Sequence, residues 1–165
     1  MSIASITARH TVQFSETDMA GLVHFSQYFR YMEKAEATLF QSLGFSLIGI
    51  EGDRFRGWPR VRASASFRAP LYFEDELEIH LFIKEIKIRA IEYFFRFSRV
   101  RCPFAEREGR AWERDLAKGS MTTLFVEKTG LAGEMRGLAL PAELVARLTP
   151  ADPATYLRTD RSGEG

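Results

Sequence analysis

The segment FSETDMAGLVHFSQYFRYMEKAEA, residues 14–37, places Asp18 three residues before Gly21 and ahead of an amphipathic stretch that opens at Phe25. The amino end of a helix offers unpaired N–H groups and a partial positive charge, which stabilise an oxyanion. A nearby carboxylate acts as a nucleophile or as a general base, and a glycine lets the backbone approach a ligand closely. Acids before helices also serve as caps or turn residues, so a catalytic and a structural interpretation stay open.

Basic residues form a second group that could bind a ligand. Lys87 and Arg89 alternate along one predicted strand, with Lys84 nearby, and Arg60 and Arg62 form another pair. Ammonium and guanidinium groups both suit phosphate. A solvated strand edge explains the same residues equally well, and the spacing does not decide between the two interpretations.

Composition excludes several classes of protein. The chain has 165 residues, a formal net charge of +1 and 45% hydrophobic residues, which predicts a packed globular protein without an overall bias toward nucleic acid or an anionic membrane. The single cysteine, Cys102, excludes an intrachain disulfide and a cysteine-based zinc site. No cluster has metal-ligand spacing, no apolar run approaches the roughly 18 residues that span a bilayer, and the start lacks a signal peptide's apolar core. We therefore expect a soluble, cytoplasmic protein without a metal or cofactor.

The hydrophobic pattern predicts the elements that position these residues. Apolar residues at helical spacing predict a helix from Phe25 to Leu43, ended by Gly44. Alternating residues predict strands at 7–14, 60–70, 71–86 with a turn at 73–75, 90–100 and 119–128. We interpret 101–119 as an irregular hairpin connection and 141–148 as a short helix. The expected organisation is one domain over 1–148 and a flexible tail over 149–165.

One long helix among antiparallel strands is an α+β layout. The wide aromatic face of the helix, with Phe29, Met32 and Leu39, must lie against a large surface, so we expect the sheet to pack on it. Glu33 and Glu36 lie three residues apart on this helix, where ion pairs with neighbouring basic residues explain them. We assign neither a catalytic role, and His10 and His80, which fall in predicted strands, receive none.

The stretch VQFSETDMAGLVHFSQYFRYMEKAEATLFQSLG resembles the 4-hydroxybenzoyl-CoA thioesterase family, which has the hotdog fold: an antiparallel sheet wrapped around one long central helix. The matching positions are Phe14, Thr17-Asp18, Gly21-Leu22-Val23 and His24-Phe25. SFRAPLYFEDELEI resembles the family's strand–turn–strand segment, and the resemblance covers roughly residues 8–148. It implies an acyl-CoA thioesterase without a cofactor.

The resemblance also implies roles for individual residues. The family's catalytic carboxylate falls on Asp18, beside Gly21, and its carbonyl-polarising backbone amide falls on Phe25. Its coenzyme A contacts fall on Lys87 and Arg89. Ala90 replaces a small hydroxyl residue, so one hydrogen bond to pantetheine or phosphate is absent, and the pair His24-Phe25 departs from the family's usual aromatic pair.

His24 has two interpretations. The D-x5-H spacing is close to the D-x4-H pair of hotdog hydratases, but one extra residue turns a helical side chain by roughly 100°. We expect His24 to line the pocket or to be a structural residue; the alternative is a catalytic or substrate-orienting role. Tyr28, Met32, Trp58 and Pro59 are candidates for the wall of an acyl pocket, and they could equally be core residues.

The sequence thus predicts a thioesterase in which Asp18 is the base or nucleophile and the Phe25 amide polarises the carbonyl. Family members are dimers or tetramers with interfacial sites, so the resemblance implies a homodimer or homotetramer. One alternative is a hotdog enoyl-thioester hydratase or dehydratase that uses Asp18 and His24. Another is a module that binds acyl-CoA or an acyl-carrier protein without turnover.

Overall fold

The structure, a computed structural model, describes residues 1–130 and 132–157. Its one long helix, α1, spans Gln27–Ser42. The side chains that α1 buries recur every three or four residues, as expected for a helix with one face on a core; they are Tyr28, Tyr31, Met32, Ala35, Glu36, Leu39 and Phe40. The helix ends as predicted, because Gly44 adopts a φ of 74° and its N–H bonds to the Gln41 carbonyl.

The main sheet is antiparallel and has five strands in the order β1-β5-β6-β7-β4. The strands are β1 (Ser5–Thr11), β4 (Arg60–Phe67), β5 (Glu76–Ile86), β6 (Ala90–Arg101) and β7 (Asp115–Leu124). Alternate residues of β5 are buried, namely Leu77, Ile79, Leu81 and Ile83, as the pattern predicts. Glu74, with a φ of 66°, lies in the predicted turn before β5.

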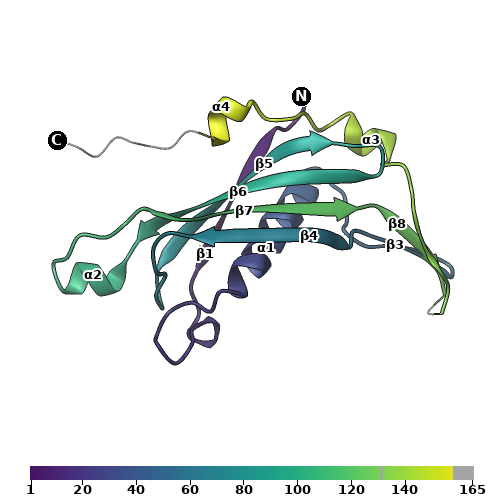
Figure 1. Cartoon of the computed structure of the whole chain (residues 1–165). Helices are drawn as coiled ribbons and strands as arrows, with labels where there is room; N and C mark the ends of the chain where they lie inside the picture. Colours follow the sequence, from purple (N-terminus) through teal and green to yellow (C-terminus); the bar gives the residue numbers. More distant parts are fainter. Residues whose placement is uncertain (131, 158–165) are drawn as a thin grey trace.

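The core lies between α1 and one face of this sheet, and Figure 1 shows the helix running across the strands. Gly119 of β7 marks the closest approach: a Cβ built there would lie 2.1 Å from Met32 Cε and 2.9 Å from the Ser64 carbonyl oxygen. Only a glycine lets helix and strand pack this closely. The α+β class and the antiparallel sheet are confirmed.

A second, four-stranded sheet was not predicted. It consists of β2 (Gly49–Glu51), β3 (Arg54–Gly57), β8 (Val126–Thr129) and β9 (Met135–Gly137), in the order β2-β3-β8-β9. The predicted strand 119–128 is two strands, because the chain leaves the main sheet at Phe125 and β8 pairs with β3 instead. The predicted strand 7–14 likewise ends at Thr11, before the short 3-10 helix η1 (Phe14–Glu16).

The remaining segments cover the ends and the outer face of the main sheet. The predicted irregular connection 101–119 contains a short helix, α2 (Pro103–Arg107), and the first residues of β7. The helix predicted at 141–148 is shorter, α3 (Ala142–Val145). The predicted tail begins with α4 (Pro153–Tyr156), whose buried Tyr156 packs on Phe82 and Phe94, and its residues 158–165 lie outside the described residues. None of the described helices is long and apolar enough to cross a membrane.

Candidate active site

The loop before α1 is folded back on itself by the backbone. Thr17 and Val23 form an antiparallel bridge, and the Asp18 N–H donates to the Leu22 carbonyl at 2.8 Å. The Gly21 N–H closes the turn by donating to the Asp18 carbonyl at 3.0 Å. Gly21 has a φ of 77°, and a Cβ there would meet no atom within 4 Å. The glycine is therefore required by the left-handed backbone of this turn rather than by crowding.

The Asp18 carboxylate is exposed, and backbone N–H groups of its own loop bind one of its two oxygens. Its Oδ1 accepts the N–H of Ala20 at 2.8 Å and that of Leu22 at 3.3 Å. Within the described residues, Oδ2 has no hydrogen-bond partner. Asp18 is thus a turn acid, and it does not cap α1. One oxygen fixes the orientation of the carboxylate while the other stays available to a ligand.

Phe25 lies two residues before α1, not at its first position as predicted. The neighbouring amides are occupied, because the His24 N–H donates to the Glu16 carbonyl at 2.9 Å and the Gln27 N–H donates to the His24 carbonyl at 2.9 Å. The Phe25 N–H donates to no acceptor in the part of the chain that the structure describes. A free donor thus lies at the entrance of the helix, where the positive end of its dipole adds to the donor's effect.

His24 is exposed and fixed locally. Its Nδ1 lies 2.8 Å from Ser26 Oγ, and its ring centroid lies 4.5 Å from that of Phe25. No contact joins it to Asp18 among the described residues. The imidazole therefore lies against the Phe25 ring and Ser26, and no contact in the described residues couples it to the Asp18 carboxylate.

The two basic pairs differ in availability. Arg60 Nη2 lies 2.6 Å from Glu36 Oε2, so this guanidinium serves a buried ion pair. Lys87 and Arg89 are exposed, but they lie in the turn between β5 and β6 and not on one strand face as predicted. Lys87 is paired with Glu92 and Glu85, and Glu92 raises the pKa of the Lys87 ammonium. Arg89 has no ion-pair partner in the described ranges.

Three of the four pocket candidates, Tyr28, Met32 and Trp58, are core residues. Tyr28 packs on Phe67 and on Phe97 near the amino end of α1, with ring centroids 4.9 and 5.2 Å away. Trp58 packs on Phe40 near the carboxyl end, at 4.9 Å, and is buried together with Met32, while Pro59 is half-buried. The structure does not bring the four together around one described cavity.

Residues 17–25 line neither of two cavities found among the described residues. One, of about 160 Å³, lies under α2 and includes Tyr72, Arg99 and Trp112; the other, of about 590 Å³, includes His10 and Lys34. The surface around Asp18 is instead open and apolar. The exposed large side chains near Asp18 in the chain are Phe14, Met19 and Phe25, and Phe73 packs against Phe14 with ring centroids 5.7 Å apart. No group of three or more His, Cys, Asp or Glu side chains within the described residues is arranged to hold a metal ion.

Comparison with known proteins places the chain among thioesterases. A family model described as the thioesterase-like superfamily matches residues 12–148. An Aquifex aeolicus protein assigned as an esterase is 35% identical over 92 residues, which cover 56% of this chain and 68% of that protein. A 1,4-dihydroxy-2-naphthoyl-CoA hydrolase of Synechococcus sp. is 27% identical over 157 residues, covering 86% and 93%. The crystal structure of 4-hydroxybenzoyl-CoA thioesterase from Pseudomonas sp. has a TM-score of 0.70 at 22% identity, covering 87% of this chain and 99% of that one.

Proposed function

Because the chain belongs to the thioesterase-like superfamily, we propose that it hydrolyses an acyl-CoA thioester to a carboxylic acid and free coenzyme A. The observation that carries this proposal is the free Phe25 N–H at the entrance of α1, on the same folded loop as a carboxylate with one free oxygen. A thioester carbonyl needs both groups: a donor for its oxygen and a base or nucleophile for its carbon.

The proposed reaction follows from these two groups. The thioester oxygen accepts the Phe25 N–H, which stabilises the negative charge that develops as the carbonyl carbon is attacked. In the general-base route, Asp18 Oδ2 takes a proton from water, the water oxygen bonds to the carbon, and the C–S bond breaks. The proton then passes to the leaving thiolate, so the products are the acid and the free thiol.

Asp18 could also attack the carbonyl itself and form a mixed anhydride that water then hydrolyses. A single turnover in water labelled with ¹⁸O distinguishes the general-base route from a nucleophilic route in which water attacks the aspartyl carbon of the anhydride. In the general-base route the label enters the product directly. In the nucleophilic route with water attacking the aspartyl carbon, the product takes an unlabelled oxygen from Asp18 and the label remains on the protein.

We further propose an aromatic acyl group and a coenzyme A site at the β5–β6 turn. The names of the related hydrolases are those of aromatic acyl-CoA enzymes. Two exposed aromatic side chains, Phe14 and Phe25, lie within seven residues of Asp18 in the chain, and Phe73 packs against Phe14. Arg89 is exposed and available to a phosphate, whereas Lys87 would first have to leave Glu92. Tyr28, Met32, Trp58 and Pro59 would then support the pocket from the core.

The same family membership supports a hotdog fold in which α1 is the central helix and a homo-oligomer completes the site. β4 lies at an edge of the main sheet and exposes Val61 and Phe67. An unpaired edge with apolar side chains favours association with a second copy. The open apolar surface around Asp18 would become the wall of a pocket between two subunits.

The test is a thiol-release assay over aromatic and aliphatic acyl-CoA substrates, with Asp18→Asn measured alongside. We expect the substitution to lower kcat by at least about 10²-fold, the scale of one general acid–base group. Asp53→Asn, which changes an exposed acid in the loop between β2 and β3, is the control and should be unchanged. Binding of acyl-CoA without thiol release, or hydration of crotonyl-CoA without hydrolysis, would overturn the proposal.

A further inference from the structure

We propose that Glu16 is a positioning residue that holds the Asp18 carboxylate and the Phe25 amide at the separation that the reaction needs. The inference rests on the proposed thioesterase function. Sequence reasoning missed this residue, because its partners come from three separate elements.

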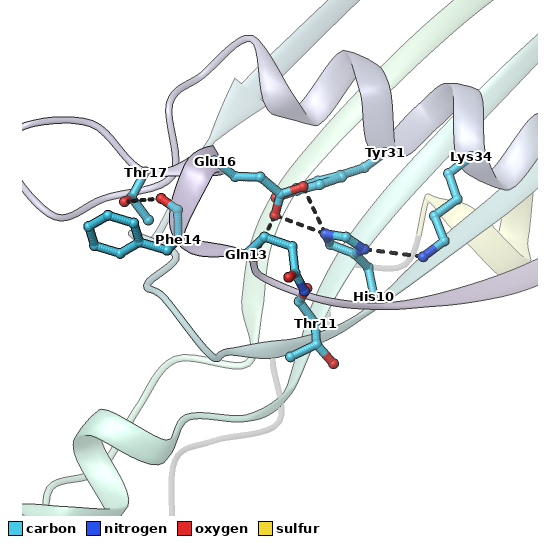
Figure 2. A network of polar contacts seen from close by, with 8 residues as sticks. All are labelled: His10, Thr11, Gln13, Phe14, Glu16, Thr17, Tyr31 and Lys34. Atoms are coloured by element: carbon cyan, nitrogen blue, oxygen red, sulfur yellow. Dashed lines mark hydrogen bonds and ion pairs between the residues drawn. The ribbon is translucent and has the colours of Figure 1, made fainter.

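The Glu16 carboxylate is the centre of a compact polar network (Figure 2). Its Oε2 accepts the Gln13 N–H at 2.8 Å and the Tyr31 hydroxyl at 3.0 Å. His10 Nε2 lies 2.9 Å from the same oxygen and 3.0 Å from Oε1. The side chain is mostly buried, with 16% of its surface exposed. One carboxylate thus connects three segments: β1 through His10, the residue before η1 through Gln13, and the second turn of α1 through Tyr31.

The backbone of Glu16 ties the catalytic loop to this network. Its carbonyl accepts the His24 N–H at 2.9 Å, which closes the base of the loop that carries Asp18. Asp18 lies two residues after Glu16, and Phe25 lies one residue after His24. The bond between Glu16 and His24 therefore fixes both arms of the loop at once. It also uses the amide next to Phe25, so that the free donor at this point is the Phe25 N–H.

The fourth member of the network, Lys34, sets which His10 ring nitrogen accepts a hydrogen bond and which donates one. Lys34 Nζ lies 3.1 Å from His10 Nδ1, and an ammonium group can only donate. Nδ1 must therefore accept, which places the imidazole proton on Nε2, where it points at Glu16. Figure 2 shows this order from Lys34 through His10 and Glu16 to Tyr31. Each donor has its acceptor only while residue 16 is a carboxylate.

Electrostatics supports an ionised Glu16. Burial by itself would raise the pKa of this carboxyl, but hydrogen bonds from the Gln13 amide and from His10, together with Tyr31, lower the pKa below the ordinary 4.5. The proximity of the Glu16 charge in turn adds to burial in raising the pKa of the Tyr31 hydroxyl, which therefore stays a donor.

The first test is Glu16→Gln, which keeps size and shape but presents an amide NH2 to the His10 Nε2–H. We expect kcat to fall by about 10- to 100-fold with KM within about twofold, because a displacement of about 1 Å between reacting groups lowers the rate by that order. Glu78→Gln is the matched control. Glu78 lies on β5, next to β1, and its carboxylate pairs with exposed Arg9 of β1, so its removal should leave kcat unchanged.

The second test asks whether a second substitution, Lys34→Met, restores the kcat that Glu16→Gln loses. In Glu16→Gln with Lys34→Met, His10 is free to carry its proton on Nδ1 and to accept the new amide at Nε2, so kcat should recover at least about threefold over Glu16→Gln alone. In the Asp18→Asn background, Glu16→Gln should cause less than about a threefold further loss, because the separation between the carboxylate and the Phe25 amide no longer limits the rate once the carboxylate is gone. A merely structural role predicts neither result.

These outcomes separate the two proposals. A wild-type protein that releases no thiol from any acyl-CoA defeats the proposed function. An active wild type with an inactive Asp18→Asn but an unchanged Glu16→Gln defeats only the positioning role. Additive losses in the double variant, or no recovery with Lys34→Met, also overturn it.

Discussion

At the scale of single residues, Glu36 is a carboxylate in the core of the molecule, with none of its surface exposed. Its Oε2 pairs with Arg60, and its Oε1 has no hydrogen-bond partner in the described part of the chain. Burial raises the pKa of Glu36 more than Arg60 lowers it. The stability of the protein therefore depends on one guanidinium that reaches in from the edge strand.

We predict that Arg60→Met lowers the free energy of unfolding by about 3 kcal/mol at pH 7, because it leaves a buried carboxylate without its partner. Chemical denaturation with urea measures this loss. Arg68→Met is the control. Arg68 is exposed, and its guanidinium lies as far as 4.0 Å from the Asp115 carboxylate, so the ion pair is weak. Its removal should change the free energy of unfolding by less than about 1 kcal/mol.

The loss should shrink as the pH falls. A carboxyl whose pKa is raised in the folded state binds protons more readily there than in the unfolded chain, so stability falls as pH rises through the interval above the ordinary 4.5. Near pH 4.5, the Glu36 carboxyl of Arg60→Met is protonated in the folded state, so it is neutral and needs no cation beside it. An equal loss of unfolding free energy at pH 7 and near pH 4.5 would contradict this account of Glu36.

Single residues also mark how far the sequence could predict the site. Asp18 and Gly21 follow from their motif, because a turn acid and a left-handed glycine are local features. The Phe25 N–H is free because the neighbouring His24 N–H donates to the Glu16 carbonyl instead. The fold of the whole loop decides which of the two amides makes this bond. Glu36 and Arg60 are 24 residues apart, and no local pattern pairs them.

At the scale of elements, the contact between α1 and β7 sets how closely helix and sheet approach. Gly119→Ala would place a methyl group against Met32 and against the backbone oxygen of Ser64. Met32 can move, but backbone of β4 cannot move without disturbing its pairing with β7. We predict a loss of about 1–3 kcal/mol in the free energy of unfolding, typical of overpacking.

Thermal and urea unfolding measure this loss, with Gly57→Ala as control. A Cβ at Gly57 meets nothing within 4 Å, and its backbone is not left-handed, so Gly57→Ala should be close to neutral. Gly119→Ala with wild-type stability would show that helix and sheet do not pack as closely as the structure has them.

Elements with a strong period were predictable, and those made by distant pairing were not. The helical spacing and Gly44 gave α1 to within two residues at its start, and alternation gave β5 and β6. The small sheet was missed because β2 and β3 are short, glycine-containing and charged, so they carry no alternating apolar pattern of their own. They become strands because β2 pairs with β3, and β3 pairs with β8, more than 60 residues away.

At the scale of the whole molecule, the β4 edge of the main sheet exposes apolar side chains. Val61 and Phe67 of β4 are 58% and 51% exposed, at a free sheet edge. We predict that the wild type sediments as a dimer or larger assembly. Val61→Lys, which blunts such an edge, should shift it toward monomer and lower thiol release.

Leu157→Lys is the control for added charge, because Leu157 is 61% exposed but follows α4, away from β4. It should leave both the assembly and the activity unchanged. Sedimentation velocity across a range of concentrations measures the assembly. A wild type that stays monomeric while fully active would remove β4 as the proposed interface.

The central claim is that a thioester lies between the Asp18 carboxylate and the Phe25 amide. The most direct measurement is a crystal structure of Asp18→Asn with an aromatic acyl-CoA that this variant turns over slowly. We predict that the thioester oxygen accepts the Phe25 N–H at about 2.7–3.2 Å, with the carbonyl carbon facing the side chain at position 18. A thioester bound elsewhere, with the Phe25 N–H bonded to protein, would contradict the claim.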